Sequence, residues 1–175
     1  NTIAERYLAE RQRDSGDVRL LSELIERLPA NAEVLDAGCG AGIPVSLMLS
    51  ERFKVTGVDF SEAQIELAKR NIPHARFLCE DMTQLDFPDS TFDGITSYYA
   101  IIHIPREEHQ ALLANFHRML KPGGLALLCL GAVLLSVLIV TGRRAPAVRH
   151  TLVVLSGFLL TAMAITLPVF VSGGL

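Results

Sequence analysis

The chain has 175 residues, half of them hydrophobic and 20% charged, a composition that fits one globular domain and excludes a disordered segment. Residues 122–175 contain three arginines and no acidic residue, so residues 1–121, with 13 basic and 19 acidic side chains, carry a net charge of −6. An acidic portion without a basic stripe excludes nucleic acid as the expected partner. The three cysteines lack metal-ligand spacing and fit a reducing cytosol, so no metal site is expected.

The first predicted elements are two helices and a strand. Residues 3–12 are typical of a short charged helix, and a second helix begins at Asp17, a residue that favours the N-cap position, and ends near Arg27. The apolar residues of this second helix recur at helical spacing: Leu20, Leu21, Leu24, Ile25 and Leu28. Val34 and Leu35 then predict the first strand.

A glycine-rich stretch, Asp36-Ala-Gly-Cys-Gly-Ala-Gly42, follows this strand and precedes a helix predicted over residues 44–51. Strand, glycine turn and helix in this order are the layout that holds an adenosine-containing cofactor. Glycines let the backbone turn tightly and approach a ligand that a Cβ atom would block. A dinucleotide-binding loop needs its third glycine at position 43, where Ile43 stands, so the spacing disfavours a nicotinamide cofactor.

The remaining elements alternate between strands and helices. Strands are predicted over residues 54–58, 76–79, 92–97 and 125–130, with helices over 61–70 and 107–120 and a turn over 121–124. His109 and His117 on the last helix are expected to face solvent. The alternation predicts an α/β fold: a Rossmann-like parallel sheet of five strands with helices on both faces. Ligands of such sheets bind at the carboxyl ends of the strands, where Gly38–Gly42, Asp59, Asp81 and Tyr98 all fall.

Five stretches carry a resemblance to a known family. They span residues 34–42, 55–61, 79–82, 92–95 and 120–124 and read VLDAGCGAG, VTGVDFS, CEDM, FDGI and LKPGG. In their order and spacing they are similar to the motifs of class I S-adenosylmethionine (SAM) methyltransferases, over roughly residues 16–130. The resemblance implies SAM as the cofactor and methyl transfer as the reaction. The family's domain continues after the fifth strand with a helix and an antiparallel strand pair, which this chain is expected to lack.

The resemblance also implies which residues hold the cofactor. The glycine loop of the family contacts the amino-acid part of SAM, a role that falls on Asp36, Gly38, Cys39, Gly40 and Gly42. Asp59 matches the acid that takes the two ribose hydroxyls, because one carboxylate can accept two hydrogen bonds. Asp81 matches the acceptor of the adenine amino group, with Met82 beside the ring and Phe60 on its other face. Three alternatives stay open: the glycines form only a tight turn, Cys39 only fills space, and Asp81 only caps a helix.

The resemblance places the acceptor pocket after the fourth strand, where Tyr98, Tyr99 and His103 are the candidate catalytic residues. His103 is suited to take a proton from an oxygen or nitrogen acceptor, since histidine is the side chain most often used as a general base; its alternative is a structural histidine before a turn. The implied reaction is direct displacement of the methyl group, with a small molecule as acceptor. A SAM-binding but inactive domain, truncated after its fifth strand, is the alternative function.

The tail does not match the family. Residues 122–142 and 151–175 are uncharged and flank a short basic segment. Each run has about 20 residues, enough at about 1.5 Å per residue to cross a bilayer core of about 30 Å. We therefore predict a hydrophobic helical hairpin that crosses a membrane, with its first span beginning near residue 124. This span competes with the strand predicted over residues 125–130, because the same residues cannot form both. The alternative is a set of elements that finish the sheet, favoured by the β-prone runs 137–140 and 152–155.

These patterns divide the chain into a methyltransferase domain, residues 1–131, and a transmembrane tail, residues 132–175. The expected partners are a small-molecule acceptor and, through residues 124–175, a membrane. The expected location is a cytoplasmic catalytic domain held at a membrane. A third alternative is a small membrane protein whose function lies in the tail.

Overall fold

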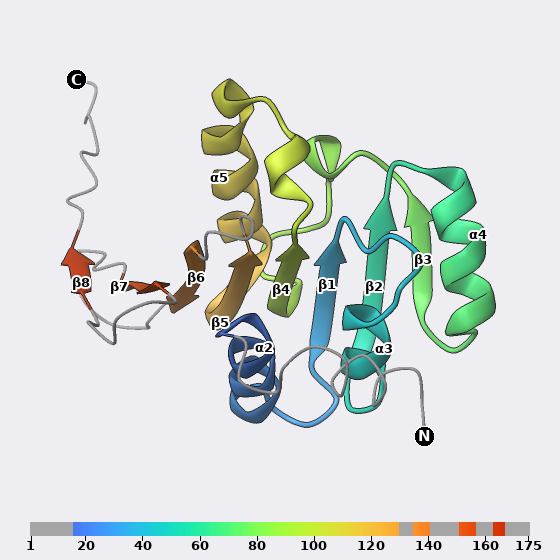
Figure 1. The fold of residues 1–175 in the computed structure, drawn as a ribbon, viewed down its shortest axis with the longest axis horizontal. Helices are drawn as coiled ribbons and strands as arrows, with labels where there is room; N and C mark the ends of the chain where they lie inside the picture. Colours follow the sequence, from blue (N-terminus) through green and yellow to red (C-terminus); the bar gives the residue numbers. More distant parts are fainter. Residues whose placement is uncertain (1–15, 130–134, 141–150, 157–162, 167–175) are drawn as a thin grey trace.

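The computed structural model describes residues 16–129, 135–140, 151–156 and 163–166. The helix expected over residues 3–12 lies outside these ranges. The elements drawn in Figure 1 are α2 Gly16–Arg27, β1 Glu33–Ala37, α3 Val45–Ser50, β2 Lys54–Asp59, α4 Glu62–Asn71, β3 Arg76–Cys79, β4 Phe92–Tyr98, α5 His109–Met119, β5 Leu120–Cys129, β6 Leu135–Val140, β7 Thr151–Ser156 and β8 Met163–Thr166, with short 3-10 helices η1 Met82–Gln84, η2 Ile101–His103 and η3 Arg106–Glu108.

One sheet runs through all described strands, in the order β3-β2-β1-β4-β5-β6-β7-β8. Its first five strands are parallel, which confirms the predicted Rossmann-like fold class. The chain builds outward from β1 to β3 and then returns to place β4 on the other side of β1. The strand order therefore reverses between β1 and β4, and parallel sheets bind ligands at such a switch point.

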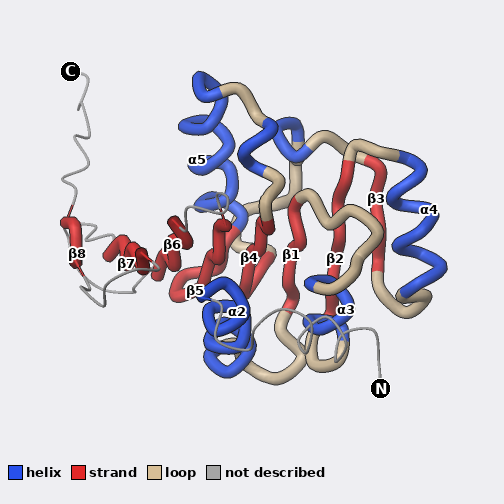
Figure 2. The backbone as a smooth tube through the Cα atoms, viewed as in Figure 1, coloured by secondary structure: helices blue, strands red, loops and turns tan. Residues whose placement is uncertain are grey.

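Helices cover both faces of the parallel part, as predicted (Figure 2). Successive residues of a strand point to opposite faces: Val34 of β1 belongs to the apolar cluster that includes residues of α2 and α3, whereas Leu35 belongs to the cluster formed with α5. Ile65 and Ala68 of α4 form a third cluster with Phe77 of β3. The central strands are thus buried on both sides, which fixes the positions of their carboxyl ends.

Several boundaries differ from the sequence-based expectation. The turn expected over residues 121–124 lies inside β5, where the pairing register with β4 shifts and Gly123 has φ of +85°. Helix α5 begins at His109 because the three residues before it form η3. His109 is half-buried rather than solvent-facing, since a nitrogen of its ring lies 2.9 Å from the carbonyl oxygen of Ile104. Ser61 stands at the N-cap of α4, but its hydroxyl makes no capping hydrogen bond.

The described parts of the tail correct the prediction of a helical hairpin. β6 pairs antiparallel with β5, β7 with β6 and β8 with β7, so antiparallel strands follow the fifth strand after all. An apolar, β-branched segment next to the edge of β5 satisfies that strand's free backbone groups, which a helix cannot do. Within the described ranges no helix is long and apolar enough to span a bilayer. The predicted membrane spans also include residues outside those ranges.

Candidate functional site

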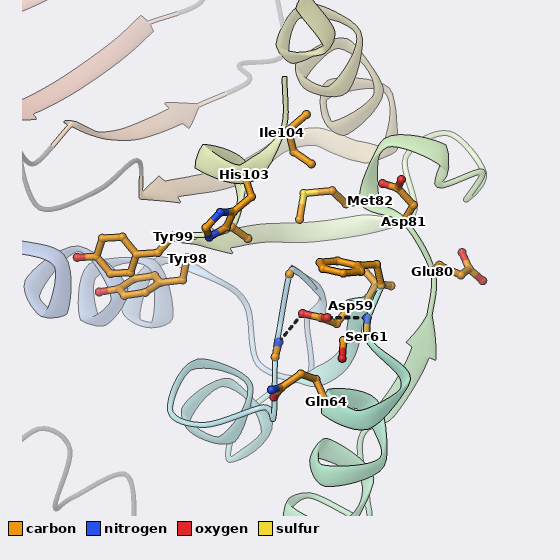
Figure 3. Close-up of a pocket in the computed structure, with 15 residues that line it drawn as sticks. Asp59, Ser61, Gln64, Glu80, Asp81, Met82, Tyr98, Tyr99, His103 and Ile104 are labelled. Carbon is orange, nitrogen blue, oxygen red and sulfur yellow. Dashed lines mark hydrogen bonds between the residues drawn. The ribbon is translucent and has the colours of Figure 1, made fainter. Parts of the chain in front are cut away.

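A pocket of about 670 Å³ opens at the carboxyl ends of the parallel strands, beside the switch point between β1 and β4 (Figure 3). It brings together nine of the twelve residues predicted from sequence: Gly38, Gly40, Asp59, Phe60, Asp81, Met82, Tyr98, Tyr99 and His103. Its other lining residues are Val58, Ser61, Gln64, Glu80, Ala100 and Ile104. Segments from residue 38 to residue 104 therefore meet at one edge of the sheet.

The glycine loop is held against β2. The backbone N–H groups of Gly38 and Cys39 both donate to the carbonyl oxygen of Val58, at 2.8 and 2.9 Å. Gly38 has φ of +80°, and a Cβ atom there would lie 2.1 Å from the Cβ of Ala100. Only glycine fits this position, because any side chain would collide with the segment that follows β4.

Asp59 joins the glycine loop to the start of α4. Its Oδ2 accepts a hydrogen bond from the backbone N–H of Gly40 at 2.9 Å, and its Oδ1 accepts one from that of Ser61 at 2.9 Å. A carboxylate has about four lone-pair sites, so both oxygens keep capacity for a further donor. The side chain therefore fixes the loop and still offers two acceptors to a pair of hydroxyl groups in the pocket.

Asp36 does not line the pocket. It is 1% exposed, and the hydroxyls of Ser46 and Thr96 donate to its carboxylate at 2.5 and 3.0 Å. Burial raises the pKa of Asp36 to about 6; the two hydroxyl donors lower it and the charge of Asp59 raises it slightly. In this structure Asp36 ties β1 to α3 and β4 beneath the loop and has no surface in the pocket.

Cys39 and Gly42 are likewise absent from the lining. Burial raises the pKa of the Cys39 thiol far above its usual range, and the charges of Asp36 and Asp59 raise it further. The neutral thiol packs against the cluster beneath α4, as the space-filling alternative predicts. A Cβ atom on Gly42 would meet Ile72 at 3.0 Å, so this glycine also faces α4 rather than the pocket.

The opposite wall comes from the segment after β3. Asp81 caps η1, since its Oδ1 accepts hydrogen bonds from the N–H and the hydroxyl of Thr83, both at 2.9 Å. Asp81 therefore does cap a helix, which was the alternative interpretation, and its side chain also lines the pocket. Met82 is buried beside Gly38, whereas Phe60 is 80% exposed at the mouth of the pocket.

The segment after β4 supplies the third wall. The rings of Tyr98 and Tyr99 meet edge to face at 5.0 Å and pack toward the α2 side of the sheet, away from Asp81 (Figure 3). His103 is exposed on η2 and is seen between the tyrosine pair and Met82. Tyr99 has φ of +59°, an unusual backbone conformation for an aromatic residue, and it turns the chain toward Gly38.

Six lining residues were missed from sequence. Glu80 directly follows β3, so its place at the strand end is a signal that could have identified it. Gln64 lies one turn into α4, the helix that Asp59 precedes. Ala100 has no sequence signal, because its approach to Gly38 depends on the left-handed turn at Tyr99.

The charge of the lining indicates the charge of the ligand. Asp59, Glu80 and Asp81 line the pocket, and no lysine or arginine is among the described residues that do so. Acidic walls without a cationic partner favour a ligand that carries positive charge.

Comparison with known proteins identifies the family. The family model described as a methyltransferase domain matches residues 34–124, more than half of the chain. The chain belongs to the methyltransferase family. The match runs from β1 into β5 and includes every lining residue of the pocket.

Two curated methyltransferases illustrate the similarity. Trans-aconitate 2-methyltransferase of Variovorax paradoxus is 36% identical over 127 residues, which cover 70% of this chain and 46% of that protein. 2-Methyl-6-phytyl-1,4-hydroquinone methyltransferase of Synechocystis is 33% identical over 105 residues, which cover 58% of this chain and 32% of that protein. The chain spans about half or less of the length of the curated relatives that it matches.

The match to one solved structure covers a larger share of both chains. The TehB-like SAM-dependent methyltransferase from Corynebacterium glutamicum is 32% identical, with a TM-score of 0.59, over 74% of this chain and 73% of that one. SAM is accordingly the cofactor of this methyltransferase family. The pocket suits it, because SAM carries a positive sulfonium, the lining is acidic, and Gly40 leaves open space where a Cβ atom would meet only Gln64 Oε1 at 3.8 Å.

Proposed function

We propose that this chain transfers the methyl group of SAM to a small-molecule acceptor by direct displacement. The contact of 2.9 Å between Asp59 and the N–H of Gly40, inside the pocket at the switch point, carries this proposal. It brings the glycine loop and the ribose-binding acid to one place, although 19 residues separate them in sequence. Family membership and the acidic lining support the same conclusion.

Each wall of the pocket has a proposed role toward SAM. Gly38 and Gly40 hold the amino-acid part, and Asp59 accepts from the two ribose hydroxyls. The adenine ring lies between Phe60 and Met82, and Asp81 accepts from its amino group. SAM supplies a methyl group that is already activated by the positive sulfur. The protein aligns acceptor and methyl group and excludes water, an effect that can lower the barrier by about 7–11 kcal/mol.

The acceptor side is proposed to lie at Tyr98, Tyr99 and His103. His103 takes the proton of an oxygen or nitrogen acceptor, and the tyrosine pair forms an apolar wall. The two curated relatives named above have small-molecule acceptors in their names. We further propose that residues 1–131 form the catalytic unit.

Calorimetric titration with SAM tests the cofactor assignment. We expect wild type to bind in the micromolar range, about −8 kcal/mol. Asp59→Asn keeps the shape of the side chain but removes its charge, and its NH2 group replaces one oxygen that accepts from Gly40 or Ser61, so binding weakens by at least about 1.5–3 kcal/mol. Glu62→Gln is the matched control, because this exposed acid on α4 does not line the pocket. Equal heats for wild type and Asp59→Asn would contradict the ribose assignment.

Turnover requires a second readout. Formation of S-adenosylhomocysteine in the presence of a panel of small carboxylic acids, phenols and amines would show methyl transfer. Binding of SAM without any S-adenosylhomocysteine across the panel favours the alternative of a binding-only domain.

A further inference from the structure

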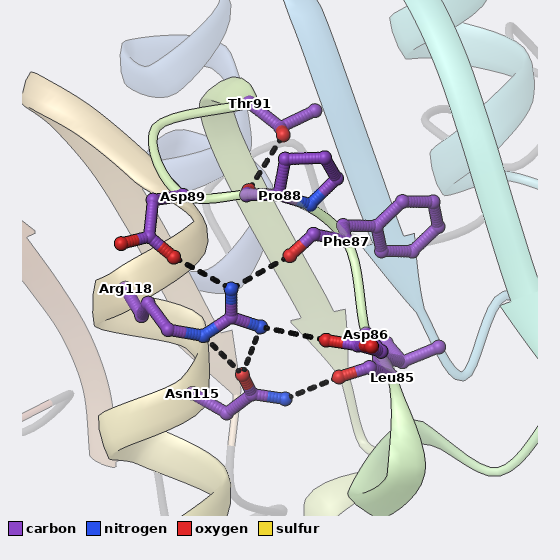
Figure 4. Close-up of polar contacts among 8 residues, drawn as sticks. All are labelled: Leu85, Asp86, Phe87, Pro88, Asp89, Thr91, Asn115 and Arg118. Atoms are coloured by element: carbon purple, nitrogen blue, oxygen red, sulfur yellow. Dashed lines mark hydrogen bonds and ion pairs between the residues drawn. The ribbon is translucent and has the colours of Figure 1, made fainter.

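Helix α5 holds the loop that connects η1 to β4 (Figure 4). The Nδ2 amide of Asn115 donates to the carbonyl oxygen of Leu85 at 2.7 Å. The Nη1 group of Arg118 donates to the carbonyl oxygen of Phe87 at 2.8 Å and to Asp89 at 2.7 Å. Two backbone carbonyls of the loop, at residues 85 and 87, therefore accept hydrogen bonds from side chains of one helix.

Arg118 fixes the orientation of Asn115. Its Nε and Nη2 groups donate to Asn115 Oδ1 at 3.1 and 2.8 Å, so the amide group can only turn its N–H side toward Leu85. Asparagine is an unfavourable residue inside a helix. Its presence in the last turns of α5 is explained by this hydrogen bond across to the loop rather than by helix stability.

The same loop begins at the pocket. Leu85 directly follows η1, and η1 begins at Met82, which lines the pocket beside Asp81. Leu85 is 3% exposed and belongs with Met82 to the apolar cluster that α5 covers through Leu112 and Phe116. The pocket-facing segment is therefore packed against α5 and anchored to it just behind the residues that face the ligand.

The two acids near Arg118 contribute less to this anchor. Asp86 and Asp89 are strongly exposed, and exposed ion pairs add little stability. The hydrogen bonds to the backbone carbonyls set the position of the loop, because they fix the main chain itself.

We propose that Asn115, oriented by Arg118, is a positioning residue for the wall of the pocket formed by Asp81 and Met82. Asn115 touches neither ligand nor pocket; it sets the distance of that wall from the glycine loop. The inference rests on the proposed function, since it assigns this wall to the adenine ring of SAM. A ligand that contacts the wall should therefore lose affinity when the Asn115 hydrogen bond is removed.

Asn115→Asp is the decisive variant, because an aspartate can still accept from Arg118 but cannot donate to Leu85. Calorimetry with S-adenosylhomocysteine and with 5′-methylthioadenosine, which lacks the amino-acid part, provides the readout. We expect both ligands to bind about 3- to 10-fold more weakly, by a common factor, since the lost hydrogen bond affects only the adenine side. Arg118→Lys should cause a smaller loss in the same direction.

Two controls separate positioning from general destabilisation. Gln110→Ala removes an exposed side chain from the same helix. Asp93→Asn weakens the hydrogen bonds that Asp93 accepts from the N–H of Glu33 and from Lys121, near the amino ends of β1 and β4 and away from the pocket. Both should retain wild-type affinities while folded, as judged by circular dichroism.

The outcomes are distinct. Wild-type affinity in Asn115→Asp for both ligands, or a loss for S-adenosylhomocysteine alone, would overturn the positioning role. If Asn115→Asp does not fold, Arg118→Lys decides by the same criteria. Failure of wild type to bind S-adenosylhomocysteine would instead overturn the proposed function.

Discussion

Asp36 is a buried carboxyl group whose pKa rises from 3.8 to about 6 on folding. Because the pKa is higher in the folded protein, the folded protein binds a proton more tightly than the unfolded chain does. Below pH 3.8 both states are protonated at this group, and above about pH 6 both are ionised. Between these values the free energy of unfolding falls as pH rises, by about 3 kcal/mol in total.

Asp36→Asn should remove this dependence, because asparagine stays neutral and can still bond to the hydroxyls of Ser46 and Thr96. We expect the difference in unfolding free energy, wild type minus variant, to fall by about 2.4 kcal/mol between pH 4 and pH 7, most of the total, because the unfolded chain is already partly ionised at pH 4. Urea denaturation at several pH values measures this difference, in which the other titrating groups cancel. A difference independent of pH would show that Asp36 ionises with an ordinary pKa in the folded protein.

At the scale of elements, the glycine loop contains glycines with different surroundings. Gly40 and Gly42 both have positive φ, so alanine strains the backbone at either site by about 1–2 kcal/mol. A Cβ atom on Gly42 would press on Ile72 at 3.0 Å, whereas one on Gly40 would enter the pocket. The two substitutions should therefore separate stability from binding.

We expect Gly42→Ala to lower the free energy of unfolding more than Gly40→Ala does, by about 1 kcal/mol, because it also overpacks the contact with α4. Gly40→Ala should weaken binding of S-adenosylhomocysteine about tenfold, equivalent to about 1.4 kcal/mol, while Gly42→Ala leaves it nearly unchanged. Thermal denaturation and calorimetry measure the two effects. A similar loss of affinity in both variants would show that Gly42 contributes to cofactor binding.

Sequence patterns predict elements well where only one structure fits the pattern. The helical spacing of Leu20, Leu21 and Leu24 predicts α2, and the β-branched run before Asp59 predicts β2. The tail fits two structures, because an uncharged apolar run long enough to be predicted as a membrane helix can also form buried strands. The pairing of β6 with β5 decides between them for the described residues, and this long-range contact is not encoded in either segment alone.

The residues of the site likewise divide into those that sequence patterns predict and those that long-range contacts determine. Residues at strand ends, such as Asp59 and Tyr98, could be predicted, because the parallel topology brings those ends together. The resemblance assigns Asp36 to the cofactor, although its carboxylate is buried and bonded to Ser46 and Thr96. Ala100 could not be found, since its position depends on one backbone angle at Tyr99. Topology was thus accessible from sequence, and side-chain direction was not.

For the whole molecule, the described pocket lies entirely within the parallel part of the sheet. Its lining residues fall between residues 38 and 104, whereas the antiparallel strands begin at Leu135 and join only the outer side of β5. The cofactor site and the antiparallel strands therefore share β5 as a support but share no lining residue. Removing residues 132–175 should therefore change ligand binding little but leave the outer side of β5 unpaired.

We expect a chain of residues 1–131 to bind S-adenosylhomocysteine with an affinity within about twofold of that of the full chain, since no described contact of the pocket is lost. The same truncation leaves the outer edge of β5 without its partner strand. Its run Leu125–Cys129 is buried and apolar, so the free edge should promote self-association. Sedimentation velocity at rising protein concentration would reveal this self-association. Loss of ligand binding by truncated protein that remains folded would contradict the proposed boundary and would assign the antiparallel strands a part in the site itself.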